Sequence, residues 1–105
     1  MTFSSEDSLL FLAHTDFSRC LNQTFDVSVG DSAIPMALVE LRKLKTFHYD
    51  GIVREPFSLI FRSERQTILP QKIYQMKNSS IGSLGIFIVP VGRDRTGVLY
   101  EAVFN

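Results

Sequence analysis

The sequence predicts a single, mainly β domain, and three observations support that prediction. The chain has 105 residues, a length that suits one domain with one core. From Thr24 onward, apolar and polar residues alternate with the period of two that is typical of strands. Glycine, proline and asparagine interrupt this alternation at short intervals. We therefore expect residues 24–105 to form six antiparallel strands, as a small barrel or a two-layer sheet, after a helical lead-in at residues 1–22.

The lead-in is expected to contain one or two short helices. Two serines followed by two acidic residues near the start are typical of the beginning of a helix. Further along, Thr15 is expected to cap a second helical turn. On that turn Phe17, Cys20 and Leu21 would share one apolar face.

The six expected strands cover residues 24–29, 36–47, 56–62, 72–77, 84–91 and 98–104. The second strand is expected to begin only after Pro35, because proline can start a strand but rarely lies in its middle. The fifth is apolar on both faces, which predicts a central strand covered on both sides. Gly92 and Gly97 bound the loop expected between the fifth and sixth strands.

The charge pattern argues against a nucleic-acid partner. Eleven basic and eleven acidic residues give a formal net charge of zero, whereas nucleic-acid-binding domains usually carry a basic surplus. The charges are separated along the chain, with six acidic residues and one basic residue in 1–41, and eight basic and three acidic residues in 42–77. Segments of opposite charge that face each other or another subunit explain this better than a phosphate-binding surface.

The compartment expected for the protein is the cytoplasm. Cys20 is the one cysteine, so no intrachain disulfide can form. The amino terminus lacks the basic region of a signal peptide, and its apolar run at 9–13 is too short to span a membrane.

Neither a catalytic cysteine nor a metal site is expected. Cys20 with His14 or His48 could act as nucleophile and base, but the neighbouring apolar residues favour a buried cysteine that serves packing. One cysteine and two distant histidines do not supply the ligands of a zinc site. We therefore expect no metal and no cofactor.

The candidate binding residues are Arg93, Asp94 and Arg95, at the tip of the expected hairpin. Two exposed arginines there could bind a phosphate or a carboxylate. The structural interpretation, which we favour, is that Asp94 caps the turn and pairs with an arginine.

Glu101 is the candidate for a structural charge pair. It lies between apolar residues of the last strand, so if covered it needs a cation such as Arg54 or Arg93. The competing interpretation is a general acid, and an enzyme built from Glu101, Arg54 and Tyr74 is the weakest of the functional hypotheses. We expect no enzymatic activity.

A distinctive set of segments spans residues 55–105. They are Glu55–Phe61, Leu69–Gln71 with Tyr74, Gly82, Phe87–Gly92, Arg93-Asp94, Gly97 and the closing Tyr100-Glu101-Ala102-Val103-Phe104-Asn105. In these segments the chain resembles a small bacterial family of single-domain proteins, a domain of unknown function. Residues 17–41 fit less closely, and Asn22 stands where a glycine is expected. The resemblance implies no enzymatic activity. Relatives in this family look like neighbours of tail-collar-type proteins of phage-like assemblies, which suggests a structural or accessory role.

The leading functional hypothesis is thus a non-catalytic structural or assembly module that associates with itself or with a protein partner. The alternative is a small binding domain that holds an anionic ligand or nucleic acid through the loop of Arg93 and Arg95.

Overall fold

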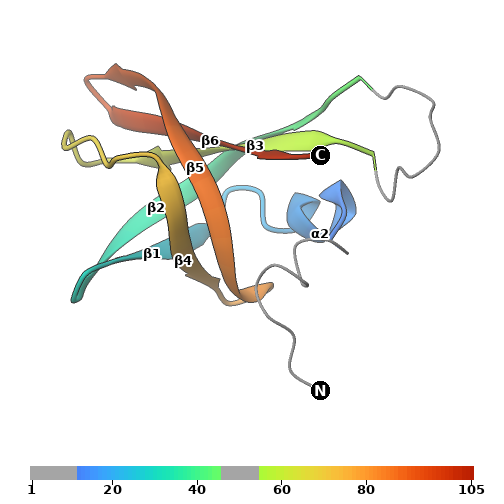
Figure 1. The fold of residues 1–105 in the computed structure, drawn as a ribbon, viewed down its shortest axis with the longest axis horizontal. Helices are drawn as coiled ribbons and strands as arrows, with labels where there is room; N and C mark the ends of the chain where they lie inside the picture. Colours follow the sequence, from blue (N-terminus) through green and yellow to red (C-terminus); the bar gives the residue numbers. More distant parts are fainter. Residues whose placement is uncertain (1–11, 46–54) are drawn as a thin grey trace.

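The computed structural model describes residues 12–45 and 55–105, and these form a closed barrel of six antiparallel strands (Figure 1). The elements are α2 (His14–Ser18), β1 (Thr24–Val29), β2 (Ser32–Lys43), β3 (Phe57–Ser63), β4 (Lys72–Asn78), β5 (Gly82–Asp94) and β6 (Gly97–Phe104). Around the barrel the strands follow the order β1-β2-β3-β6-β5-β4, and β1 closes the ring against β4. The expected mainly β fold is confirmed, in its barrel form.

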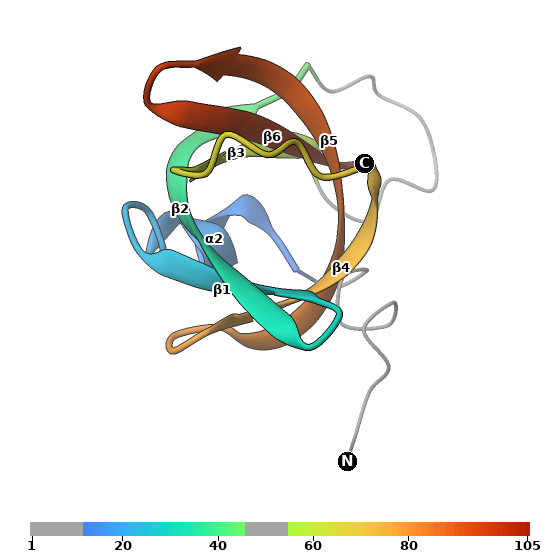
Figure 2. The same cartoon turned by 90° about the vertical axis from the view of Figure 1, so that its left-hand side faces the viewer.

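The alternation seen in the sequence places large apolar side chains inside the barrel. On β3, Phe57, Leu59 and Phe61 are fully buried, and the alternate residues of β6 are buried too. Figure 2 shows the strands as a ring, with α2 inside its outline. The buried cluster consists of Phe17, Cys20, Phe25, Val27, Ile34, Met36, Leu38, Phe57, Leu59, Phe61, Leu69, Tyr74, Met76, Leu84, Ile86, Ile88, Val98, Tyr100, Ala102 and Phe104.

The helix α2 differs from the expected helical turn at both ends. Its N-cap is Ala13, whose N–H donates a hydrogen bond of 2.8 Å to the Asp16 carboxylate, so Thr15 lies inside the helix and is not the cap. The Asp16 carboxylate thus makes one half of a capping box, while the alanine has no side-chain acceptor for the other half. Because α2 ends at Ser18, Leu21 falls outside the helical face and is exposed. The first expected helix and His48 lie outside the described residues.

Asn22 has a backbone φ of 67°, in the left-handed region that favours glycine. Asparagine tolerates this conformation better than most residues. The Asn22 N–H donates a hydrogen bond of 2.7 Å to the Leu38 carbonyl, which ties the link between α2 and β1 to β2. Glycine is expected at position 22 from the family resemblance, and the left-handed backbone of Asn22 is a conformation that glycine adopts readily.

The expected start of the second strand after Pro35 is wrong, because β2 begins at Ser32 and Pro35 lies inside it opposite Asp26. Pairing between β2 and β3 starts only at Met36. At Pro35, β2 is therefore paired with β1 but not with β3. The missing N–H of proline breaks no hydrogen bond of the ladder on the β3 side.

The expectation that the fifth strand is covered on both sides is also wrong. The inner residues of β5 are buried, but Phe87 and Val91 on its outer face are exposed. The loop after it is shorter than predicted, since β5 continues to Asp94 and β6 begins at Gly97. Of the two glycines expected to bound the loop, Gly97 alone has a positive φ, of 140°.

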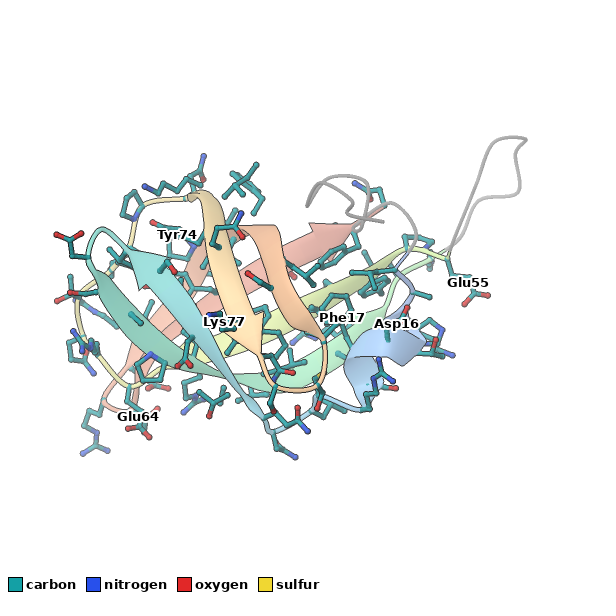
Figure 3. All side chains as sticks on the ribbon, turned by 90° about the horizontal axis from the view of Figure 1, so that it is seen from below. Asp16, Phe17, Glu55, Glu64, Tyr74 and Lys77 are labelled. Atoms are coloured by element: carbon teal, nitrogen blue, oxygen red, sulfur yellow. The ribbon has the colours of Figure 1, made fainter. Side chains whose placement is uncertain are left out.

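The two ends of the barrel are closed by different segments. At one end lies α2 with Phe17 (Figure 3). The Phe17 ring packs against the rings of Phe57 and Phe104. At the other end runs the β3–β4 loop, residues 64–71, beside the β5–β6 hairpin (Figure 1). There the buried hydroxyl of Tyr100 accepts a hydrogen bond of 2.9 Å from the Leu69 N–H. We call this second end the hairpin end.

Candidate functional site

The carboxylate of Asp94 is used within its own turn. One of its oxygens accepts a hydrogen bond of 2.7 Å from the Thr96 N–H and one of 2.5 Å from the Thr96 hydroxyl. These hydrogen bonds, chiefly the one from the hydroxyl, lower the pKa of Asp94, and the charge of Arg62 acts in the same direction. The arginine near Asp94 is thus Arg62 of β3, which also donates a hydrogen bond to the Thr96 hydroxyl.

Arg93 and Arg95 are both exposed, but only one of them can be assigned to a face of the barrel. Arg93 lies opposite Val98, whose side chain points into the core, whereas Arg62 lies opposite Leu99 on the outer face. Residues directly opposite each other in a ladder share a face. Arg93 and Arg62 therefore lie on opposite faces of the barrel wall.

The hairpin is attached to the end of β3 and to the β3–β4 loop. The Gln66 side-chain amide donates to the carbonyl oxygens of Asp94 and Arg95, at 3.2 and 3.4 Å. A Cβ at Gly97 would stand 1.8 Å from the Ser63 carbonyl oxygen, so only glycine allows this approach. These contacts join segments about thirty residues apart in sequence at one end of the barrel.

Beside the hairpin, a groove of about 360 Å³ runs over the outer faces of β1, β2 and β3. Its lining residues are Thr24, Pro35, Met36, Ala37, Arg62, Glu64 and Arg65. Figure 3 places Glu64 at the end of the barrel away from α2. No local sequence pattern singles out Arg62 and Arg65; the available signal is the position of both in the basic segment 42–77.

Glu101 is half-buried on the outer face of β6, between Ile60 of β3 and Val89 of β5. Arg42 is near enough for its pKa to be raised by the charge of Glu101, although the main cause of that rise is its hydrogen bond to Glu40. Arg93, on the other face of the wall, is not placed to pair with Glu101. Arg54 lies outside the described residues.

Tyr74 and Glu101 are separated by the barrel wall. The Tyr74 ring is buried inside the barrel, and its hydroxyl donates a hydrogen bond of 2.6 Å to the Pro70 carbonyl. Burial raises the pKa of that hydroxyl. The two side chains thus do not face a common space, which is what a catalytic pair would require.

Cys20 is fully buried beneath α2 and belongs to a polar network within the core. Its thiol lies 3.7 Å from the Asn78 side-chain oxygen, which also accepts hydrogen bonds from the backbone N–H groups of Ser80 and Ile81. Burial raises the pKa of the Cys20 thiol.

The contacts of His14 are with other residues than Cys20. Its Nε2 atom lies 3.8 Å from the Glu55 carboxylate, and its ring meets the ring of Phe57 edge to face.

The outer face of β4 and β5 carries exposed apolar side chains. Ile73 and Phe87 are directly opposite each other in the ladder, and they are 59% and 49% exposed. Further along β5, Val89 is half-buried and Val91 exposed on the same strand. We call Phe87, Val89 and Val91, together with their β4 neighbour Ile73, the β5 outer face. Contiguous exposed apolar surface of this kind commonly marks a contact with another molecule.

Within residues 12–45 and 55–105, no group of three His, Cys, Asp or Glu side chains could hold a metal ion. In the same part of the chain, no helix has the length and apolar character needed to cross a membrane.

Comparison with known proteins identifies one family. The model of a domain of unknown function, DUF6916, matches residues 12–104, which is nearly the whole chain. No curated protein and no solved structure matches the sequence. The matched region begins just before α2 and includes every strand of the barrel.

Proposed function

The chain belongs to the DUF6916 family of domains of unknown function, and we propose that it is a non-catalytic assembly module, accessory to a multi-protein apparatus such as a phage-tail-like assembly. Its single cysteine supports a reducing compartment, and we place the module in the cytoplasm. The separation of Tyr74 from Glu101 supports a role without catalysis.

The observation that carries this proposal is the exposure of Ile73 and Phe87 side by side on the β5 outer face. A closed barrel has no free strand edge, so the described strands are not expected to associate edge to edge. The described strands can still associate through an outer face of the barrel. No charged residue lies on β5 between Ser83 and Gly92. The occupant we propose for this face is the same face of a second copy, because an apolar patch can pack on itself about a two-fold axis without matching charges.

The expected dimer is weak. Burying the exposed parts of Ile73 and Phe87 in both copies contributes on the order of 8 kcal/mol, while association costs about 4 kcal/mol or more. Contacts of Val89 and Val91 would add to this small surplus. A dissociation constant of about 10 μM to 1 mM is expected.

Sedimentation equilibrium of the full chain up to about 1 mM tests this. The wild type should shift from monomer to dimer with concentration, and Phe87→Lys should remain monomeric. Ile68→Lys is the matched control, because Ile68 is 48% exposed but lies in the β3–β4 loop; it should dimerise like the wild type. A wild-type chain that stays monomeric throughout, or equal effects of both variants, would disprove the proposal.

A further inference from the structure

The hairpin end of the barrel concentrates positive charge that its own residues do not neutralise. Arg62 lies in β3 and Arg65 lies two residues beyond the end of that strand, and the β5–β6 hairpin adds two more arginines. Of the two carboxylates in these segments, that of Asp94 is occupied by its hydrogen bonds to Thr96. Glu64 is then the one exposed carboxylate that lines the groove beside them.

The groove beside Arg62 and Arg65 combines these cations with an apolar floor. Pro35 and Ala37 of β2 form part of the floor on the outer face of the barrel. Among the described residues, no hydrogen bond or ion pair joins the Arg65 side chain to another group. Its guanidinium is free to bind a ligand without first losing an internal partner.

Arg62 is held in place by the hairpin. It donates to the Thr96 hydroxyl, and Thr96 in turn donates to Asp94. Gln66 of the β3–β4 loop also donates hydrogen bonds to two hairpin carbonyls. The part of β3 that carries Arg62 is therefore connected to the hairpin both directly and through this loop. Such fixed positions reduce the entropy lost when a ligand binds.

We propose that this groove binds an acidic segment of a partner protein, with a carboxylate on Arg62 and Arg65 and a neighbouring apolar side chain on Pro35 and Ala37. Guanidinium groups form paired hydrogen bonds with carboxylates. Phosphate polymers fit less well, because Glu64 lies among the cations and the whole domain has no net charge to attract a polyanion. This site is separate from the β5 outer face, so its binding does not depend on self-association.

The test uses the full chain and fluorescein-labelled peptides in which aspartate or glutamate alternates with leucine, with binding followed by fluorescence anisotropy. A matched peptide with glutamine and asparagine in place of the acids is the ligand control. The acidic peptide should bind, and binding should weaken between about 20 and 150 mM salt as exposed charges are screened. The neutral peptide should not bind.

Two charge reversals locate the site. Arg65→Glu should weaken binding about tenfold or more, which corresponds to roughly 1.4 kcal/mol. Arg93→Glu is the matched control: it changes the net charge equally, but Arg93 lies on the inner face of the wall, so the effect should be less than about twofold. The Arg65 side chain makes no hydrogen bond to the described residues, so the folded state should persist, and circular dichroism checks this. Arg65→Gln should give an intermediate loss.

Three results would overturn the proposal. They are no binding of the acidic peptide at low salt, equal losses for the two reversals, and displacement of the peptide by inorganic phosphate or single-stranded DNA at lower concentration than by unlabelled peptide. The Phe87→Lys variant separates the two proposals, because it should bind the peptide like the wild type even where it no longer dimerises.

Discussion

The two ends of the barrel are closed by different interactions. At the α2 end, the rings of Phe17, Phe57 and Phe104 pack with centroids 4.7 to 5.8 Å apart. At the hairpin end, directed hydrogen bonds connect the β3–β4 loop to Tyr100 and to the hairpin. Apolar packing is non-directional and tolerates small shifts, whereas hydrogen bonds and close backbone approach fix positions. The α2 end therefore serves mainly stability, and the hairpin end can hold arginines in place for binding.

Of the variants that test this difference between the two ends, Phe17→Ala is expected to lower the free energy of unfolding most. The side chain is fully buried between two other rings, and its removal leaves a cavity at the α2 end. We expect a loss of about 3–5 kcal/mol in the free energy of unfolding, measured by urea denaturation. Arg19→Ala, at the exposed C-cap of the same helix, should cost less than about 0.5 kcal/mol. If Phe17→Ala cost less than about 1 kcal/mol, α2 would not be part of the core.

Gly97→Ala is the corresponding test of the hairpin end. The added methyl group would meet the Ser63 carbonyl oxygen at 1.8 Å, and the backbone φ of 140° is unfavourable for alanine. A loss of at least about 2 kcal/mol in unfolding free energy is expected.

The control for that variant is Gly30→Ala. Gly30 has a φ of 59°, but no atom lies within 4 Å of an added Cβ. Its variant should therefore cost only about 1 kcal/mol, the conformational penalty alone. Equal losses at the two glycines, measured in the same urea series, would show that the contact with Ser63 is not rigid.

The contrast between the ends also explains which features the sequence could predict. The alternation of Phe57, Leu59 and Phe61 correctly predicted an inner face, because burial depends on the local period of two. The same rule failed on the fifth strand, where an apolar outer face was taken as covered. Local pattern says which residues are apolar, but not whether another element packs over them.

The groove could not be predicted from local patterns. Arg62 and Thr96 are 34 residues apart in sequence, and their contact depends on β3 pairing with β6. The hairpin tip itself was identified, with Asp94 in its turn, because Gly-Arg-Asp-Arg-Thr-Gly is a local turn signal. Its arginine neighbour was sought at positions 93 and 95, whereas the structure provides Arg62 from another strand.

The smallest predicted effect concerns pH and the turn at the hairpin end. Hydrogen bonds from Thr96, with the charge of Arg62, lower the pKa of Asp94 in the folded state. A lowered carboxyl pKa stabilises the fold above the ordinary value of about 3.9, and this contribution is lost as pH falls through the lower folded pKa. In Asp94→Asn the side-chain oxygen can still accept from Thr96, so stability near neutral pH should fall only slightly. What disappears is the charge, and the decline in urea midpoint below about pH 4 should be shallower than in the wild type. Asp31→Asn, in the β1–β2 turn, is the control and should keep the wild-type slope. The same acid slope in wild type and Asp94→Asn would mean that the Asp94 turn makes no charge-dependent contribution to the hairpin end.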